Sequence, residues 1–223
     1  LGTGLLQDHF VFDARYSNIQ SDGYIDRAKA NMHSYFASAA YYGNNTLIRL
    51  LTFGSIEKTY QAWTGVPSDM LGSNRTYNPC GKYEEDGVTK YYKNQTDNYL
   101  QQNYHLTTSQ HLSDLWNMNL TLHYTHGRGY YEDYKGGAKV KNYKLSPYID
   151  SQGDTITKTD LIRRKWLEND FYGIIYSVNY QGECLQLSAG AAINRYDGDH
   201  FGRVVWAKKS NSLPEPDYEY YRN

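Results

Sequence analysis

The chain has 223 residues and a formal net charge of −1, which excludes both a basic surface of the kind that binds nucleic acid and an acidic tail for a cationic partner. Its mean hydropathy is −0.79, and no run approaches the roughly 20 apolar residues of a membrane-spanning helix, which excludes a helical membrane protein. The 25 tyrosines and 4 tryptophans suit either a membrane interface or a sugar-binding platform.

The chain carries few cysteines and no visible leader. Cys80 and Cys184 are too few for a disulfide framework and lack metal-ligand spacing, so we expect both to be free. The first four residues contain neither the basic region nor the long apolar region of a signal peptide. We therefore expect the chain to begin partway through a gene product.

The first part of the chain predicts three strands. Residues 10–17 alternate, with Phe10, Phe12, Ala14 and Tyr16 opposite Asp13, Arg15 and Ser17, and a period of two is typical of a strand. A polar loop follows over residues 20–32, and residues 35–42 predict a second strand whose small side chains leave its facing open. Residues 43–45 have the composition of a tight turn, and residues 46–59 predict the third strand.

The strongest alternation lies between residues 98 and 129. Two apolar series are interleaved with polar residues: Tyr104, Leu106 and Thr108, and then Met118, Leu120, Leu122 and Tyr124. A short polar connection at residues 111–114 makes the two runs an antiparallel hairpin. Its apolar face would be a core in a soluble sandwich and would contact lipid in an outer-membrane barrel.

Further strands are predicted towards the end of the chain. Residues 60–96 and 130–159 lack sustained periodicity and predict long loops. Residues 171–180 and 184–194 predict two strands joined by a turn at residues 181–183. A third long segment, residues 195–223, ends in Tyr218, Tyr220 and Tyr221, where an eighth strand could begin.

The connections alternate between long and short, which is the pattern of a membrane barrel with loops on one side and turns on the other. The sequence therefore predicts an all-β fold, an antiparallel transmembrane β-barrel segment of about seven or eight meandering strands with short periplasmic turns and long extracellular loops. Arg49 should face away from lipid, because a charge at mid-membrane costs about 2–4 kcal/mol. The expected outward side chains are Leu120, Leu122, Tyr172, Ile174, Leu185 and Leu187, and the expected inward ones are Asn119, His123, Asn179 and Gln186.

Six segments together resemble the barrel of TonB-dependent outer-membrane receptors of Bacteroides-like bacteria. They are residues 13–17 (DARYS), 21–28 (SDGYIDRA), 57–63 (EKTYQAW), 96–99 (TDNY), 127–135 (GRGYYEDYK) and 194–200 (NRYDGDH). The resemblance implies a bacterial outer-membrane location, with membrane lipid and the TonB system as partners. It also implies import of a scarce nutrient such as an iron–siderophore complex, haem or cobalamin.

The resemblance covers only part of such a receptor, which closes a barrel of about 22 strands around a plug. Residues 1–223 are thus expected to be a partial β-barrel domain without the plug, leaving two unpaired sheet edges. Two alternatives stay open. One is a complete eight-stranded barrel, and the other is a non-transporting surface β-domain that binds glycans or a protein through tyrosine-rich loops.

No catalytic or metal-binding arrangement is predicted. His123 and His126 would lie on opposite faces of a strand, and residues 197–200 (DGDH) lack the spacing of a calcium loop. We therefore expect a protein that is not an enzyme and needs no metal or cofactor.

Ligand contacts are expected in the outer loops. The candidates combine flat aromatic faces with a cation, which suits an organic chelate carrying carboxylates or catechols. They are Tyr60, Trp63, Arg75, Tyr77, Tyr130, Tyr131 and Tyr134. The competing explanation for the tyrosines is anchoring at the membrane interface.

Overall fold

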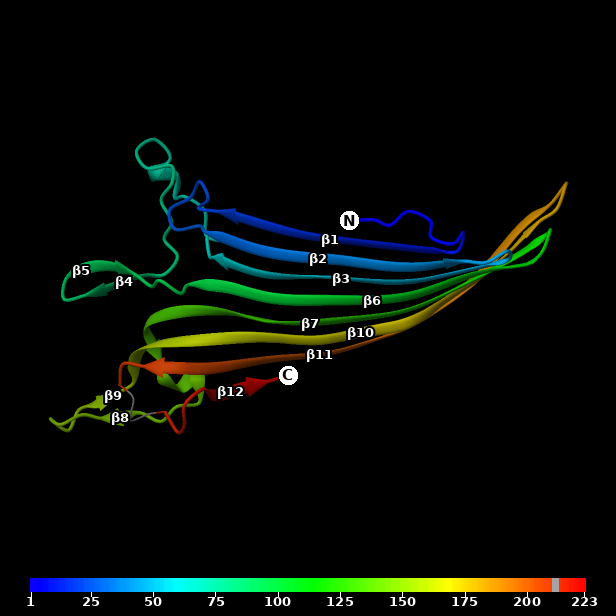
Figure 1. Ribbon diagram of the computed structural model, residues 1–223. Coiled ribbons are helices and arrows are strands. Elements are labelled where there is room, and N and C mark those ends of the chain that lie inside the picture. Colours follow the sequence, from blue (N-terminus) through cyan, green and yellow to red (C-terminus); the bar gives the residue numbers. More distant parts are fainter. Residues whose placement is uncertain (210–212) are drawn as a thin grey trace.

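The computed structural model describes residues 1–209 and 213–223, and one antiparallel sheet dominates it (Figure 1). Its strands, in sheet order, are β1 (Phe10–Ser21), β2 (Ala30–Tyr42), β3 (Thr46–Tyr60), β6 (Thr96–Ser113), β7 (Trp116–Lys139), β10 (Lys158–Gln181), β11 (Gln186–Ala207) and β12 (Tyr218–Arg222). Each strand pairs with its neighbours along the sheet order in antiparallel fashion. The prediction of an all-β antiparallel meander is confirmed, and the sheet is open instead of closed on itself.

The connections contain the remaining elements. Two small hairpins, β4 (Lys82–Glu85) with β5 (Val88–Tyr91) and β8 (Tyr148–Ile149) with β9 (Thr155–Ile156), extend the loops. Two short 3-10 helices, η1 (Ser68–Met70) and η2 (Val140–Tyr143), lie in the same loops. Within the described residues, no helix has the length and apolar character needed to span a membrane.

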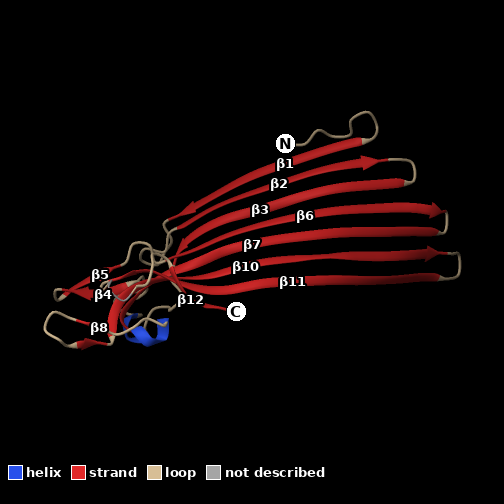
Figure 2. Ribbon diagram, turned by 90° about the horizontal axis from the view of Figure 1, so that it is seen from below, coloured by secondary structure: helices blue, strands red, loops and turns tan. Residues whose placement is uncertain are grey.

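The two ends of the sheet differ, as the connection lengths predict. The tight turns at residues 43–45, 114–115 and 182–185 lie together at one end (Figure 1). The β1–β2, β3–β6 and β7–β10 loops lie together at the other end, and Figure 2 shows the same separation from below. We call these the turn end and the loop end.

Several predicted boundaries are wrong, mostly because the strands are longer than predicted. Residues 130–139 belong to β7 and residues 195–207 to β11, although they were expected in a long loop and in a long final segment. In addition, β10 begins at Lys158, whereas the predicted strand begins at residue 171. Likewise β1 runs to Ser21, β2 begins at Ala30, and the turn of the hairpin is residues 114–115. These extensions lack an apolar side, so the alternation that marks a half-buried strand is absent from them.

The strand register sorts side chains onto two faces, because successive residues point to opposite sides of a sheet. One continuous row runs Leu50, Leu106, Leu122, Ile174 and Ile193 across five strands. We call its side the apolar face and the other side the polar face. Leu120, Tyr172 and Leu187 share the apolar face with this row, as predicted, whereas Leu185 lies in the turn before β11 and is on neither face.

The polar face carries the predicted polar side chains. Asn119, His123 and Asn179 lie on it with Gln186, and Arg49 pairs across from Ala40 and Thr107 on the same side. His123 and His126 fall on opposite faces, as predicted. Both cysteines are free.

The apolar face is unusually exposed for so many large side chains. Ile193 is 79% exposed, Ile56 is 57% exposed and Leu50 is 54% exposed. The buried core is correspondingly small, and it lies at the loop end, where the β7–β10 loop packs against the strands. Its members are Val140, Tyr143, Leu145, Leu161, Val204, Ala207 and Tyr220. Buried apolar contacts therefore stabilise the loop end, whereas no part of the described chain covers the apolar face.

Replacing Leu161 by alanine should lower the free energy of unfolding by about 2–5 kcal/mol, because Leu161 is 0% exposed and its loss leaves a cavity in this core. Urea unfolding of the chain in detergent measures the change. Leu71→Ala, at an exposed loop position, serves as the control and should shift the free energy by less than about 0.5 kcal/mol. Equal losses in the two variants would contradict the assigned core.

Candidate functional site

A pocket of about 450 Å³ opens at the loop end of the sheet, and most of its lining belongs to the polar face. We call it the polar-face pocket. Its lining residues are Glu57, Asp97, Tyr99, Gly129, Tyr130, Tyr131, Lys165, Trp166, Leu167, His200 and Tyr221. They come from β3, β6, β7, β10, β11 and β12, so only the assembled sheet brings them together.

Two adjacent rows of cross-strand partners form this pocket. The first row runs Glu57, Tyr99, Gly129, Leu167 and His200. The second row runs Asp97, Tyr131, Lys165, Gly202 and Tyr221. Because all these side chains lie on one face within two rows, a bound molecule could contact several strands at once.

Glycines in both rows make room for tyrosine rings. A Cβ added at Gly129 would collide with Tyr99, and one added at Gly202 would collide with Tyr220 and Tyr221. The glycines therefore let these rings lie flat across the neighbouring strands. The Tyr99 hydroxyl then donates a hydrogen bond of 3.0 Å to Asn169 on β10, which holds the ring in place.

The pocket has mixed charge and two groups whose ionisation is disfavoured. Burial raises the pKa of the Asp97 carboxyl and also the pKa of the Tyr131 hydroxyl, because both charged forms would lose hydration. The Lys165 ammonium lies 6.0 Å from the centre of the Tyr131 ring, near the limit of a cation–π contact. The site thus offers aromatic faces, one cation and hydrogen-bond donors.

Three of the seven predicted ligand residues lie at this pocket, of which Tyr130 and Tyr131 line it and Trp63 contacts Tyr131. Trp63, in the β3–β6 loop, packs edge-on against Tyr131 with ring centres 5.3 Å apart. The Trp63 side chain is 60% exposed, so much of the indole remains open to solvent. Tyr130 also lines the pocket, but its ring packs against Trp166 at 4.4 Å, and Arg164 lies over it at 4.7 Å.

The other four predicted residues lie apart from the polar-face pocket. The Tyr60 hydroxyl donates to the carbonyl oxygens of Cys80 and Tyr92 at 3.2 Å and 2.9 Å, so it ties two parts of the loop together. Tyr134 stacks on Tyr83 with ring centres 4.5 Å apart. Arg75 is exposed in the β3–β6 loop, and Tyr77 lies beside Tyr91 in the same loop.

The assignment of Tyr130, Tyr131 and Tyr134 to an outer loop is wrong, since all three belong to β7. Their positions alternate between faces, so Tyr131 lies on the polar face while Tyr130 and Tyr134 lie on the other. Because the strand places them on opposite faces, Tyr131 cannot contact the same bound molecule from the same side as Tyr130 and Tyr134. The seven residues do not form one cluster.

Buried ion pairs hold this end of the sheet rigid. Arg163 donates to both carboxylate oxygens of Asp133 at 2.8 Å and 3.2 Å, and Arg164 donates to Glu132 at 2.7 Å. The two pairs occupy neighbouring positions and therefore opposite faces. Glu132 also accepts from Asn94 and Tyr92, whereas Arg163 donates to Tyr143, so each pair fastens a different loop to the strands.

Sequence reasoning missed Asp97, Lys165 and His200, because their strand segments have no apolar side. The available signal was charge complementarity. Glu132-Asp133 on β7 and Arg163-Arg164 on β10 are opposite pairs of the kind that face each other across adjacent strands. If these charged residues are taken as cross-strand partners, the two predicted strands extend as far as the pocket.

The described residues contain no group of three or more His, Cys, Asp or Glu side chains arranged to hold a metal ion. The acidic residues of the run at 197–200 are instead paired with arginines. Asp197 accepts from Arg195 at 2.9 Å, and Asp199 accepts from Arg222 at 2.7 Å.

Comparison with known proteins found no matching protein-family model and no matching curated protein. The function of the chain must therefore be argued from its own residues.

Replacing Asp97 by asparagine should stabilise the chain at neutral pH. The folded-state pKa of Asp97 is raised, so its ionisation opposes folding, and wild-type stability falls as the pH rises from the unfolded pKa through the folded pKa. Asp97→Asn should remove this loss. Unfolding curves across pH measure it, and below about pH 3 the two proteins should converge, because the carboxyl is then largely protonated in both states. If Asp97→Asn is less stable than wild type at pH 7 but equally stable below about pH 3, the direction assigned to the Asp97 pKa shift is wrong.

Proposed function

We propose that this chain forms a sector of the wall of a transmembrane β-barrel in the bacterial outer membrane. The barrel would belong to a TonB-dependent receptor that imports a scarce, bulky nutrient such as an iron–siderophore complex, haem or cobalamin. In this proposal the apolar face contacts lipid, the polar face lines the lumen, and the chain performs no chemistry of its own. The whole of residues 1–223 would be barrel, with the plug supplied by other parts of the receptor.

The observation that carries the proposal is a band without charge across seven strands of the apolar face. The band comprises Phe10, Phe12, Ala14 and Tyr16 of β1, Tyr35, Ala37, Ala39 and Tyr41 of β2, Ile48, Leu50, Thr52 and Gly54 of β3, Tyr104, Leu106 and Thr108 of β6, Met118, Leu120, Leu122 and Tyr124 of β7, Tyr172, Ile174, Tyr176, Val178 and Tyr180 of β10, and Leu187, Ala189, Ala191 and Ile193 of β11. The polar face at the same level carries Asp13, Arg15 and Arg49. Lipid on one side and water on the other would account for this difference.

Aromatic side chains bound the band at both of its ends. Trp116 and Tyr180 lie at the turn end with ring centres 5.0 Å apart, and Tyr104 and Tyr124 stack at the loop end at 6.1 Å. From Trp116 to Tyr124 the strand rises about 27 Å, at roughly 3.4 Å per residue. That length fits the roughly 9–11 tilted residues with which barrel strands cross a bilayer, and paired aromatic girdles are typical of such barrels.

The edges of the sheet support a sector instead of a complete small barrel. Within the described residues, β12 pairs with β11 only at Phe201–Val204, with further backbone contacts between His200 and Asn223. The rest of β11 therefore has unpaired backbone groups. The outer side of β1 also has them beyond Ala14, since residues 1–6 hydrogen-bond to β1 only between Phe10 and Ala14. In a bilayer each such group would be costly, so further strands should cover both edges.

The polar-face pocket suits the cargo in this proposal. It would lie inside the lumen at the extracellular end, where a solute first enters. Tyr131, Trp63 and Lys165 offer aromatic faces and a cation to a planar or catechol-bearing chelate.

A soluble glycan- or protein-binding domain is the alternative, and it has less support. A soluble sandwich would cover the apolar face with a second sheet, but the described residues form one large sheet and two two-stranded hairpins. An exposed apolar surface of this extent marks a lipid or partner interface.

A pair of charge substitutions tests the membrane proposal. Leu122→Arg should block insertion into vesicles, because a charge near the middle of the lipid-facing band costs about 2–4 kcal/mol. The matched control is Thr121→Arg, one residue away on the polar face, which should insert as well as wild type. Insertion is scored by vesicle flotation and protection from protease. If Thr121→Arg fails and Leu122→Arg inserts, the assignment of the faces is reversed and the proposal is lost.

A second pair tests the cargo site. Tyr131→Ala should weaken binding of a ferric catecholate by about 3–10-fold, because one aromatic contact contributes about 0.5–1.5 kcal/mol. Tyr134→Ala is the control, since its ring stacks on Tyr83 away from the polar-face pocket. Quenching of tryptophan fluorescence by the iron chelate, in chain folded in detergent, measures the affinity. Equal affinities for wild type and Tyr131→Ala would exclude this pocket as the contact.

A further inference from the structure

A second pocket opens on the polar face, further from the loop end than the polar-face pocket, and its volume is about 260 Å³. On β3, Phe53 of this second pocket lies four residues, or about 14 Å, from Glu57 of the polar-face pocket. Phe53 also stands between Thr52 and Gly54, so the second pocket lies at the level of the uncharged band and on the opposite face. We call it the Arg15 pocket. Its lining includes Arg15, Ser34, Phe36, Phe53, Ser55 and Gln101.

Two rows of cross-strand partners form the Arg15 pocket. Arg15, Phe36 and Phe53 are direct neighbours in the first row, which crosses β1, β2 and β3. The second row consists of the two serines and Gln101. Within the part of the chain that the structure describes, the side chains of this second row have no hydrogen-bond partner. The pocket therefore combines a cation, two aromatic rings and free hydroxyl and amide groups.

Arg15 is the one charged residue that lines this pocket, and its charge is not neutralised. Among the described residues it takes part in no ion pair. Asp13 lies on the same face of β1, but its carboxylate stands beside Gly2 at the outer edge of the sheet, 2.7 Å from the place that a Cβ of residue 2 would take. A guanidinium presents a fork of N–H donors that matches the two oxygens of a carboxylate. Arg15 is therefore free to bind a carboxylate from outside the chain.

The two phenylalanines indicate what lies next to that carboxylate. The Phe53 side chain is 37% exposed, and its ring packs edge-on against His105 with ring centres 5.7 Å apart. A planar or apolar group laid over Phe36 and Phe53 would remove their apolar surface from water. The pocket is slightly smaller than the roughly 300 Å³ at which typical ligand sites begin, so it fits one ring-and-carboxylate group of a solute instead of a whole chelate.

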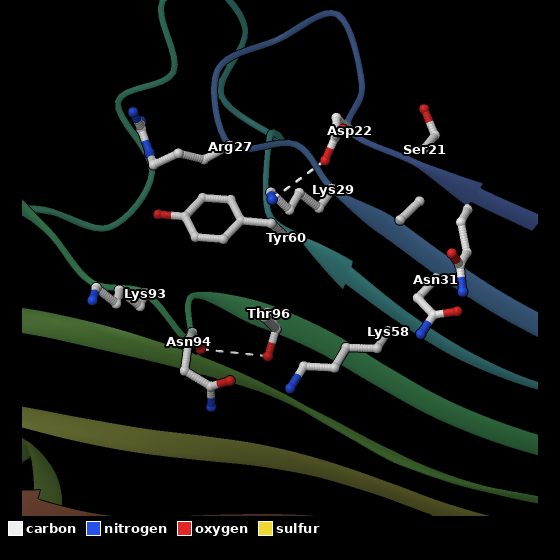
Figure 3. Close-up of a pocket in the computed structure, with 12 residues that line it drawn as sticks. Ser21, Asp22, Arg27, Lys29, Asn31, Lys58, Tyr60, Lys93, Asn94 and Thr96 are labelled. Carbon is white, nitrogen blue, oxygen red and sulfur yellow. Dashed lines mark hydrogen bonds and ion pairs between the residues drawn. The ribbon is translucent and has the colours of Figure 1, made fainter.

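A larger collection of cations at the loop end is less suited to a single carboxylate. Figure 3 shows Arg27, Lys29, Lys58 and Lys93 around a pocket of about 530 Å³, with Arg27 turned away from Lys58 and Lys93. The Arg27 guanidinium instead lies over the Tyr91 ring at 3.7 Å and donates to the backbone oxygen of Asn78. These cations do not converge on one point, whereas Arg15 stands directly beside an aromatic pair.

We propose that the Arg15 pocket binds a carboxylate group of the imported solute, while Phe36 and Phe53 cover the planar or apolar part that bears it. This inference rests on the proposed membrane function, because only there does the polar face line a lumen. A solute that leaves the polar-face pocket would then meet Arg15 about 14 Å further in. The substrate class that follows is an organic chelate with at least one free carboxylate on a planar or apolar group.

The test compares para-fluorobenzoate with its neutral isostere para-fluorobenzamide, titrated against the full chain in detergent and followed by fluorine NMR, with empty micelles as the blank. Wild type should bind the acid about tenfold more tightly than the amide, and Arg15→Gln should abolish this preference, since a hydrogen bond to a charged group contributes at least about 1.5 kcal/mol. Phe53→Leu should weaken both ligands about threefold, because it removes one aromatic contact. The control, Arg49→Gln, removes a cation from the same face four residues before Phe53 and should bind both ligands like wild type.

The outcomes separate this site from the membrane function. Flotation with phosphatidylcholine vesicles scores insertion alone, and failure to insert removes the membrane function together with the lumenal role of Arg15. If the chain inserts but binds acid and amide equally, or if Arg15→Gln and Arg49→Gln lose affinity equally, the Arg15 pocket is not a carboxylate site and the membrane function stands. Insertion with a loss confined to Arg15→Gln and Phe53→Leu supports both proposals.

Discussion

The antiparallel register of the long strands, which shifts only near the strand ends, is the constraint on which the rest of this structure depends. Each backbone hydrogen bond of the ladder fixes which residues stand opposite one another, and parity then assigns every side chain to a face. A slip of one residue between β6 and β7 would move Leu122 to the polar face and His123 to the apolar face. The apolar face and the polar-face pocket both depend on the same register.

The sheet changes character along its length, and this change explains where stability resides. In the band between the aromatic girdles, the apolar face is bare and contributes little burial within the chain. Beyond the band both faces carry charge, and the buried pairs Arg163–Asp133 and Arg164–Glu132 with the small core around Leu161 hold the loops. Such pairs fix the relative positions of the strands and loops more than they add net free energy of folding, because the cost of desolvating the charges offsets much of their attraction. The loop end is thus an ordered platform and not a set of free loops.

The role proposed for the polar-face pocket follows from the face on which it opens. It lies at the loop end and draws residues from six strands, and most of them belong to the polar face. Under the proposed function, this pocket would meet solute in the lumen.

The sequence by itself determined the all-β class, the antiparallel meander and the separation of short turns from long loops. It also assigned the correct faces to residues such as Leu122, His123 and Arg49, because a period of two is a local property of the chain. It did not reveal the true length of β7, β10 and β11, or the grouping of Asp97, Tyr131 and Lys165. It likewise placed Tyr130 and Tyr131 in a loop, whereas a strand sends them to opposite faces. Only the tertiary structure decided these points. Beyond the alternating segments, strand pairing depends on hydrogen bonds and cross-strand charge pairs between residues that are far apart in the sequence.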